Sequence, residues 1–148
     1  LLLKVSGPHG DFYISPVHFY NPWAKLSLWD LMMSALGTDN INYKQAAEHL
    51  RLLREDIDLQ KDAVIVVGDF NAAKNFYELN MAAYNLYAGT FFDVGVNEPT
   101  FPSLSAKDLG SKFPDVIIDQ IFTNAFKGGK SVMLPLKGSD HYPILLSL

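Results

Sequence analysis

Apolar and polar positions fall into short blocks along this chain, and the blocks predict strands that alternate with helices. Residues 1–5 and 12–19 are apolar and extended, and the turn-rich stretch 6–11 between them predicts a β-hairpin. Residues 43–56 predict an amphipathic helix, because apolar side chains recur every three or four positions while charged side chains face away. The uninterrupted apolar run 63–67 is typical of a strand that is buried on both faces.

The rest of the chain continues this alternation. Asp39 or Asn40 is the expected cap of the helix at 43–56, and residues 77–86 predict another amphipathic helix. Residues 91–111 predict a loop-rich region, because prolines and small residues recur there. Strands interleaved with helices predict an α/β fold, and 148 residues suit a single domain. The remaining expected elements are a helix at 24–36 that ends at Gly37 and strands at 116–123, 131–135 and 142–148.

Composition narrows the classes of function. The chain has no cysteine, which excludes disulfides, thiolate zinc sites and cysteine nucleophiles. No apolar run approaches the ~18 residues that indicate a membrane-spanning helix. The formal net charge of −4 argues against a strongly basic surface that wraps nucleic acid, although it allows an enzyme that contacts a few phosphates. Because the chain opens on a strand and without Met, we expect its natural beginning to lie upstream.

The first candidate for chemistry follows the buried strand at 63–67. Asp69 and Asn71 come two residues apart just beyond it, so both side chains can point to one face. A carboxylate beside a carboxamide suits a hard, oxygen-ligated cation and a water molecule that is to be activated. The alternative is a simple turn, since Asp and Asn both favour turns.

Three further polar positions lie at or near predicted strands. Asp140 and His141 place an anionic ligand next to a proton-transfer group, although such a pair is also common in loops. Asp119 lies inside an apolar predicted strand, where a carboxylate is costly to bury without a partner. A histidine that it orients, or backbone amides, would satisfy it. His18 lies near a strand end, where a lone histidine is more often structural, and we expect His49 on the polar flank of its helix.

Together and in this order, these stretches resemble a known family. Val17-His18-Phe19, then Gly68–Ala72, Ile118–Phe122 and Ser139–Ile144 are similar to motifs in the C-terminal half of the DNase I-like endonuclease/exonuclease/phosphatase superfamily. That superfamily includes deoxyribonuclease I, abasic-site endonucleases, neutral sphingomyelinases and inositol-polyphosphate phosphatases. Residues 44–50 also resemble the family's helix before the Gly-Asp-Phe-Asn strand.

The resemblance implies a DNase I-like α/β sandwich of four layers, α-β-β-α, of which this chain supplies roughly the C-terminal half. Residues 1–148 would then be a single partial domain. The family's N-terminal part, with an Asn and a Glu that hold the main metal ion, would be missing. Apolar strand residues such as 64–67 would therefore need that missing half, or another chain, to pack against.

The activity that the resemblance implies is hydrolysis of a phosphoester, with a phosphodiester favoured, by in-line attack of water. The implied cofactor is Mg²⁺, with Mn²⁺ or Ca²⁺ as alternatives. His141, aligned by Asp119, would contact the phosphate or act as the base, and Asp69 would orient or deprotonate the water. His18 would bind phosphate or protonate the leaving group. The implied catalytic residues are thus His18, Asp69, Asn71, Asp119 and His141, and the implied metal contacts are Asp69, Asn71 and Asp140.

The substrate stays open at this point. A nuclease acting on nucleic acid is one candidate, because deoxyribonuclease-like members share the Ser-Asp-His-Tyr-Pro ending. Against it, the chain has few Lys and Arg residues and no Arg cluster near the motifs. The alternatives are a lipid or inositol phosphoesterase, and a non-catalytic or fragmentary relative that serves as a binding module.

Overall fold

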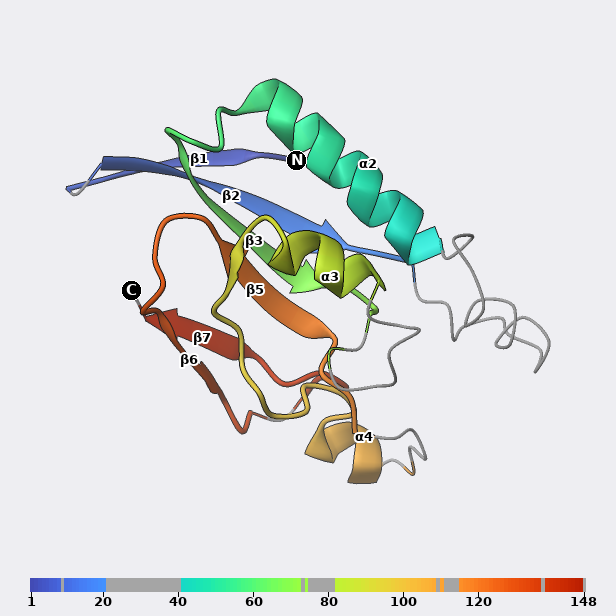
Figure 1. The fold of residues 1–148 in the computed structure, drawn as a ribbon. Coiled ribbons are helices and arrows are strands. Elements are labelled where there is room, and N and C mark those ends of the chain that lie inside the picture. Colours follow the sequence, from blue (N-terminus) through green and yellow to red (C-terminus); the bar gives the residue numbers. More distant parts are fainter. Residues whose placement is uncertain are drawn as a thin grey trace.

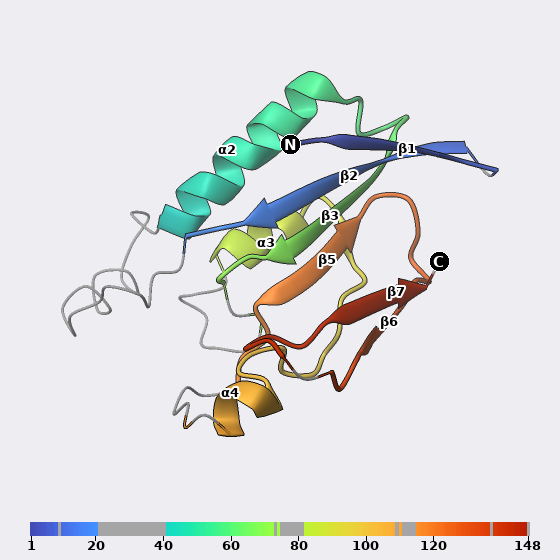
Figure 2. The same ribbon diagram turned by 180° about the vertical axis from the view of Figure 1, so that it is seen from behind.

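The structure, a computed structural model, describes residues 1–8, 10–20, 41–72, 74, 82–108, 110, 115–136 and 138–147. Within these residues, a five-stranded mixed sheet carries helices on one face and a two-stranded sheet against the other. Helix α3 (Ala82–Ala88) lies in front of the large sheet in Figure 1 and behind it in Figure 2. No helix among the described residues combines the length and the apolarity that crossing a membrane requires.

The large sheet begins with the predicted hairpin. Strands β1 (Leu3–Gly7) and β2 (Gly10–His18) pair antiparallel, which confirms it. β2 then pairs in parallel with β3 (Ala63–Asp69). The chain passes between these two strands through helix α2 (Ile41–Asp56), because parallel neighbours need a long crossover.

The sheet continues on the other side of β3. Strand β5 (Asp119–Thr123) pairs antiparallel with β3, and the short β4 (Phe92–Asp93) pairs with β5, which gives the order β1-β2-β3-β5-β4. The predicted strand at 116–123 therefore enters the ladder only at Asp119. Val116 forms an isolated bridge with Phe101 instead, so the first residues of the predicted strand face a loop.

Helices α2 and α3 cover one face of the sheet. α2 confirms the helix predicted at 43–56 and begins two residues earlier, at Ile41. Its buried positions recur at the helical period, as an amphipathic helix requires: they are Asn42, Ala46, Leu50 and Leu53. The helix predicted at 77–86 is described from Ala82 and runs on to Ala88. Residues 75–81, the expected helix at 24–36 and the expected caps Asp39 and Asn40 lie outside the described residues.

The main core lies between the helices and the sheet. Val64 and Val66 of β3 are fully buried in it, and Ile65 is buried on the opposite face, so β3 is buried on both faces as predicted. Phe70 packs edge-on against the ring of Tyr87, with centroids 5.0 Å apart. Such aromatic pairs add to the hydrophobic stabilisation of a core.

His49 corrects one expectation about α2. The side chain does not lie on the polar flank of the helix but is half-buried against the sheet and α3. Its Nε2 is 2.8 Å from the hydroxyl of Ser15 on β2, and its Nδ1 is 2.6 Å from the hydroxyl of Tyr87 on α3. The two polar partners explain why a histidine is tolerated on this face of the helix.

The second face of the sheet is covered by a hairpin. β6 (Lys130–Met133) and β7 (Ile144–Ser147) pair antiparallel, and they are shorter than the strands predicted at 131–135 and 142–148. Ile144 and Leu146 of β7 pack on Ile65 and other apolar residues of the large sheet. The expectation that this face is uncovered is therefore only partly right, since β7 covers its central strands.

The region 91–111, predicted as loop-rich, also contains regular structure. Strand β4 and the one-turn helix α4 (Leu104–Asp108) both lie in it. Both are very short, so neither leaves a periodic pattern of apolar residues that would predict it.

Candidate active site

Three neighbouring strands bring polar side chains to one end of the large sheet. His18 is the last residue of β2 and lies beside Asp69, the last residue of β3. Asp69 in turn lies opposite Asp119, the first residue of β5. Residues at the same register of adjacent strands project to the same face of a sheet. The strand pairing therefore lines up these three side chains, which are far apart in the sequence.

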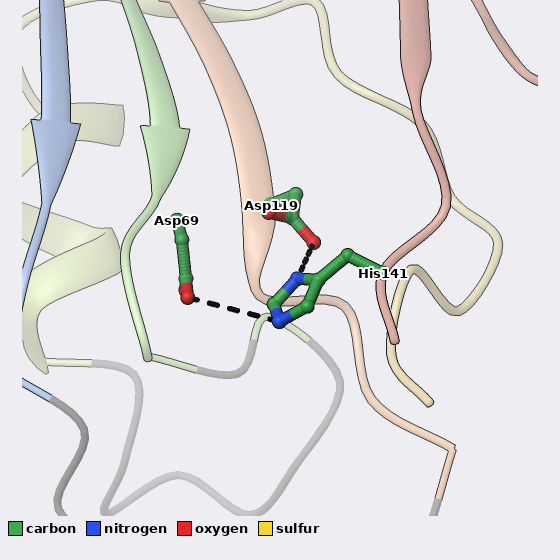
Figure 3. A group of neighbouring side chains, drawn as sticks. All are labelled: Asp69, Asp119 and His141. Carbon is green, nitrogen blue, oxygen red and sulfur yellow. Dashed lines mark hydrogen bonds and ion pairs between the residues drawn. The ribbon is translucent and has the colours of Figure 1, made fainter. Parts of the chain in front are cut away.

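His141 reaches this row from the loop that precedes β7. Its Nδ1 lies 2.8 Å from Oδ2 of Asp119, which is the hydrogen bond expected for Asp119. Its Nε2 lies 4.0 Å from Oδ2 of Asp69. Figure 3 shows the imidazole ring between the two carboxylates. Because Nδ1 is held by Asp119, the ring orientation is defined and Nε2 is directed toward Asp69.

Burial and charge change the proton affinities of this group. Burial raises the pKa of the Asp69 carboxyl, and the neighbouring Asp119 charge raises it further, while the N–H of Asn71 opposes the shift. The hydrogen bond to Asp119 raises the pKa of His141 above its ordinary value, more than burial lowers it. Two carboxylates this close favour a positive partner, which the imidazolium or a bound cation can provide.

Asn71 supports Asp69 from the loop after β3. Its backbone N–H donates to Oδ1 of Asp69 at 2.7 Å, and its side-chain Nδ2 donates to Oδ2 at 2.9 Å. Nδ2 also donates to the carbonyl of Phe19 at 2.9 Å. The backbone of Asn71 has a φ of 45°, a left-handed conformation that Asn tolerates better than most residues. Asn71 thus positions Asp69 rather than projecting beside it from the strand.

Two buried amides hold the same loop and were not anticipated from the sequence. Nδ2 of Asn42 on α2 donates to the carbonyl of Asn71 at 2.8 Å, and Nε2 of Gln120 on β5 donates to the carbonyl of Ala72 at 2.8 Å. Gln120 did carry a signal, because it is a polar residue within an apolar strand, as Asp119 is. Asn42 carried none, since an Asn at the start of a helix is commonly a cap.

The site opens into a cleft of about 290 Å³ between the large sheet and the residues that precede β7. Its lining combines the polar residues Asp119, Ser139 and His141 with the apolar residues Val67, Tyr142 and Ile144. The ring of Phe101 lies against His141, with centroids 5.0 Å apart. The cleft can therefore accept a small polar group next to His141 with an apolar surface beside it.

The predicted site residues differ in their distance from one another. Asp69, Asp119 and His141 each offer a ligand atom, and these atoms lie within 4.8 Å of one another. The exposed side chain of His18 also approaches, with Nε2 3.8 Å from Oδ2 of Asp69. Asp140 is exposed and is not part of this three-residue group, and its implied contact with a metal ion stays a prediction.

The comparison with protein families decides the affiliation of the chain. The model of the endonuclease/exonuclease/phosphatase family matches residues 7–141, which is nearly the whole sequence. The chain belongs to this family. Its members are metal-dependent phosphoester hydrolases, so the protein is placed in a hydrolase family. A comparison with curated proteins gives no match.

Several solved structures share the fold of this member of the endonuclease/exonuclease/phosphatase family. A beta toxin mutant from Staphylococcus aureus with bound magnesium ions is 19% identical with a TM-score of 0.73, and the match covers 98% of this chain and 56% of the toxin. A family protein from Leptotrichia buccalis is 16% identical with a TM-score of 0.62, covering 99% and 53%. A mannosyl-6-phosphatase from Bacteroides thetaiotaomicron is 17% identical with a TM-score of 0.58, covering 93% and 52%. The chain thus spans about half the length of these structures.

The donor set of the site fits a divalent cation. Asp69 and Asp119 supply carboxylate oxygens, the hard donors that Mg²⁺ prefers, within one small cluster. Asp69 is held by Asn71 on both oxygens and keeps lone pairs for a cation.

Proposed function

We propose that the protein hydrolyses phosphoesters, and phosphodiesters in particular, in a reaction that depends on Mg²⁺ or a similar divalent cation. The observation that carries this proposal is the position of His141. Asp119 holds one ring nitrogen at 2.8 Å, and the other faces Asp69 at 4.0 Å. Asp119 and His141 both line the cleft. A histidine oriented by a carboxylate and aimed at a second acidic group is suited to proton transfer and to binding a phosphoryl oxygen.

Each residue then has a defined task. Asp119 keeps His141 in one orientation and stabilises its charged form. His141 binds a phosphoryl oxygen through Nε2 or moves a proton there. Asp69 orients the attacking water, and Asn71 holds the carboxylate of Asp69 in place. A cation held by Asp69, with Asp119 nearby, would offset charge on the phosphoryl oxygens and lower the pKa of bound water.

His18 has room to contact the substrate. Its side chain is 79% exposed and lies 3.8 Å from Asp69, so it is available to bind phosphate or to protonate the leaving group. Asp140 is also exposed and is near enough to raise the pKa of His141 by its charge. We propose that Asp140 contributes to the field around the phosphate and not to the three-residue group itself.

The proposed substrate is a small phosphodiester rather than a long nucleic acid. The two arginines of the chain, Arg51 and Arg54, both lie toward the end of α2 that is remote from Asn42 and the site loop. They are therefore poorly placed to follow a phosphate backbone past His141. The apolar wall of the cleft is compatible with a lipid or inositol phosphoester as the substrate. A nuclease would catalyse the same hydrolysis of a phosphodiester and is the alternative.

A binding module is the second candidate, because the chain spans about half of the solved structures that it matches. We propose that the other half of the family fold packs over the outer face of the β6–β7 hairpin. There Val132 and Leu145 are cross-strand neighbours and each is 50% exposed. In that case the complete active site would require both halves.

The test is hydrolysis of bis-p-nitrophenyl phosphate by the purified protein. We expect turnover with Mg²⁺, loss of turnover with EDTA, and recovery when Mg²⁺ is restored in excess. The monoester p-nitrophenyl phosphate distinguishes a diesterase from a phosphatase. If a folded protein shows no metal-dependent turnover of either ester, the hydrolase proposal is wrong for this chain and the binding module is favoured.

A further inference from the structure

Thr100 is hydrogen-bonded both to Asp119, which orients the site histidine, and to Tyr142, which follows that histidine in the chain. Its side chain is fully buried in the loop after β4. Its Oγ1 accepts the backbone N–H of Ile118 at 3.2 Å and that of Asp119 at 3.1 Å. A single hydroxyl therefore fixes the backbone at the start of β5, from which the Asp119 side chain extends toward His141.

The backbone of the same residue fixes the other partner. The carbonyl of Thr100 accepts the N–H of Tyr142 at 2.8 Å, directly after His141 in the chain. The N–H of Thr100 donates to the carbonyl of Val116 at 3.0 Å, so the residue is itself anchored. Thr100 is thus bonded on one side to Asp119 and on the other to the residue that follows His141.

The residues after Thr100 strengthen the second attachment. The N–H of Ser103 donates to the carbonyl of Asp140 at 2.7 Å, and its hydroxyl donates to the carbonyl of Ser139. The N–H of Leu104 donates to the hydroxyl of Tyr142 at 2.8 Å. The loop that carries His141 is therefore bonded at several points to Thr100, Ser103 and Leu104.

We propose that Thr100 is a positioning residue, whose hydroxyl sets the distance between the Asp119 carboxylate and Nδ1 of His141. Without that hydroxyl, two backbone N–H groups at the start of β5 lose their acceptor, and this short strand end is free to shift. The hydrogen bond between Asp119 and His141 then lengthens, because the two partners are no longer tied to a common residue. The expected loss of activity rests on the proposed hydrolase function, whereas the expected change in the hydrogen bond between Asp119 and His141 does not.

The variant that tests the inference is Thr100→Val, which keeps the shape of the side chain and removes the acceptor. Thr100→Ser restores the hydroxyl and is the rescue variant. Thr123→Val is the matched control, because Thr123 is also fully buried and lies at the opposite end of β5. Its Oγ1 donates to the carbonyl of Val64 at 2.7 Å and accepts the N–H of Ala125 at 3.1 Å, so the control also loses a buried hydroxyl with two bonds.

Three measurements are made on each protein. Amide hydrogen exchange reports the N–H groups of Ile118 and Asp119, and proton NMR reports the Nδ1–H of His141, assigned with His141→Gln. Hydrolysis of the diester gives kcat and KM. In Thr100→Val we expect exchange at both amides to accelerate about tenfold, the scale of one hydrogen bond. We also expect the Nδ1–H signal to shift or disappear, and kcat to fall roughly 10- to 100-fold with little change in KM.

The outcomes separate the possibilities. Thr100→Ser is expected to match the unsubstituted protein, and Thr123→Val is expected to leave the His141 signal and kcat unchanged. An unchanged His141 signal in a folded Thr100→Val protein overturns the inference, whether or not the protein is an active hydrolase. Should Thr100→Val fail to fold, amide hydrogen exchange in the unsubstituted protein decides. Unprotected amides at Ile118 and Asp119 would overturn the inference. Protected amides, together with a retained His141 signal in Thr100→Ser, support it.

Discussion

At the scale of single residues, the site depends on one pairing of carboxylates. Asp69 and Asp119 face each other across adjacent strands, and burial together with this repulsion raises the pKa of Asp69. Like charges that lie directly opposite in a sheet are unfavourable. The pair persists because His141 and Asn71 each donate to one of the carboxylates. The arrangement is therefore held by hydrogen bonds to the charged forms.

Removal of either central group should abolish most of the proposed activity. We expect Asp69→Ala and His141→Ala each to lower kcat on bis-p-nitrophenyl phosphate by at least ~100-fold, which is the usual scale for groups that transfer or orient a proton. Asn71→Ala should cost less, because it acts through Asp69. Asp56→Ala, which removes an exposed carboxylate at the end of α2, is the control and should retain activity. Full turnover in a folded His141→Ala protein would contradict the assignment.

His49 gives a residue-scale prediction for stability. Burial lowers the pKa of His49 below its ordinary value of 6.5, so the unfolded chain binds this proton more readily than the folded protein. The stabilisation is present above pH 6.5 and is lost as the pH falls below that value. We therefore expect the free energy of unfolding to decrease from pH 6.5 toward the acid range.

Urea unfolding at a series of pH values measures this effect. His49→Gln should show a shallower decrease than the unsubstituted protein between about pH 5 and 6.5, because its side chain takes up no proton. His141 has a raised pKa and contributes with the opposite sign, but it is present in both proteins and cancels in the difference. Parallel pH profiles for the two proteins would show that His49 is not the group responsible.

At the scale of elements, the close contact between β2 and β3 places His18 beside Asp69. Gly68 lies at this contact with a φ of 145°, and a Cβ atom there would be 1.9 Å from the carbonyl oxygen of Val17. No side chain fits in that space, so the strands could not keep their register. The glycine is thus a requirement of the strand pairing that lines up the site.

Substitution of this glycine should disrupt the sheet. We expect Gly68→Ala to lower the free energy of unfolding by more than ~4 kcal/mol, the range that indicates a severe steric conflict. Gly10→Ala is the control, because Gly10 also has a positive φ, of 115°, but its Cβ would meet nothing within 4 Å. It should cost only the backbone strain, roughly 1–3 kcal/mol. Chemical denaturation compares the two, and equal losses would argue against a conflict with Val17.

At the scale of the whole molecule, the described residues form an uneven sandwich. Among the described residues, the helical face is covered by α2 and α3, and the opposite face by the β6–β7 hairpin and Phe126 (Figure 2). Val132 and Leu145 point away from the large sheet on that hairpin, as the alternation of burial along β6 and β7 shows. This outer surface is where the proposed remaining half of the family fold would pack.

The exposed pair should make the isolated chain self-associate. We expect sedimentation velocity to show association that increases with protein concentration, because apolar cross-strand neighbours on an open two-stranded sheet favour pairing with another copy. Val132→Lys together with Leu145→Lys should reduce it. Leu52→Lys is the control, since Leu52 is 45% exposed and belongs to α2, which packs on the opposite face of the large sheet from the hairpin. Equal association in both variants would place the contact elsewhere.

Local periodicity was enough to predict the hairpin, α2 and β3, because the spacing of apolar residues records which face of an element is buried. The hydrogen bond between Asp119 and a histidine was also foreseeable, since a carboxylate within an apolar strand needs a partner. Very short elements such as β4 and α4 were not, because a few residues carry no period.

The tertiary structure decided most of the other contacts between polar residues. The register of β3 against β5 places Asp119 opposite Asp69, and register is a property of two strands and not of either one. The same holds for Asn42, Gln120 and Thr100, whose hydrogen bonds join segments distant in sequence. The amino-acid sequence by itself determined the longer helices and strands and the types of polar side chain at their ends. Packing determined the partners, because a contact depends on where the whole chain places both of its atoms.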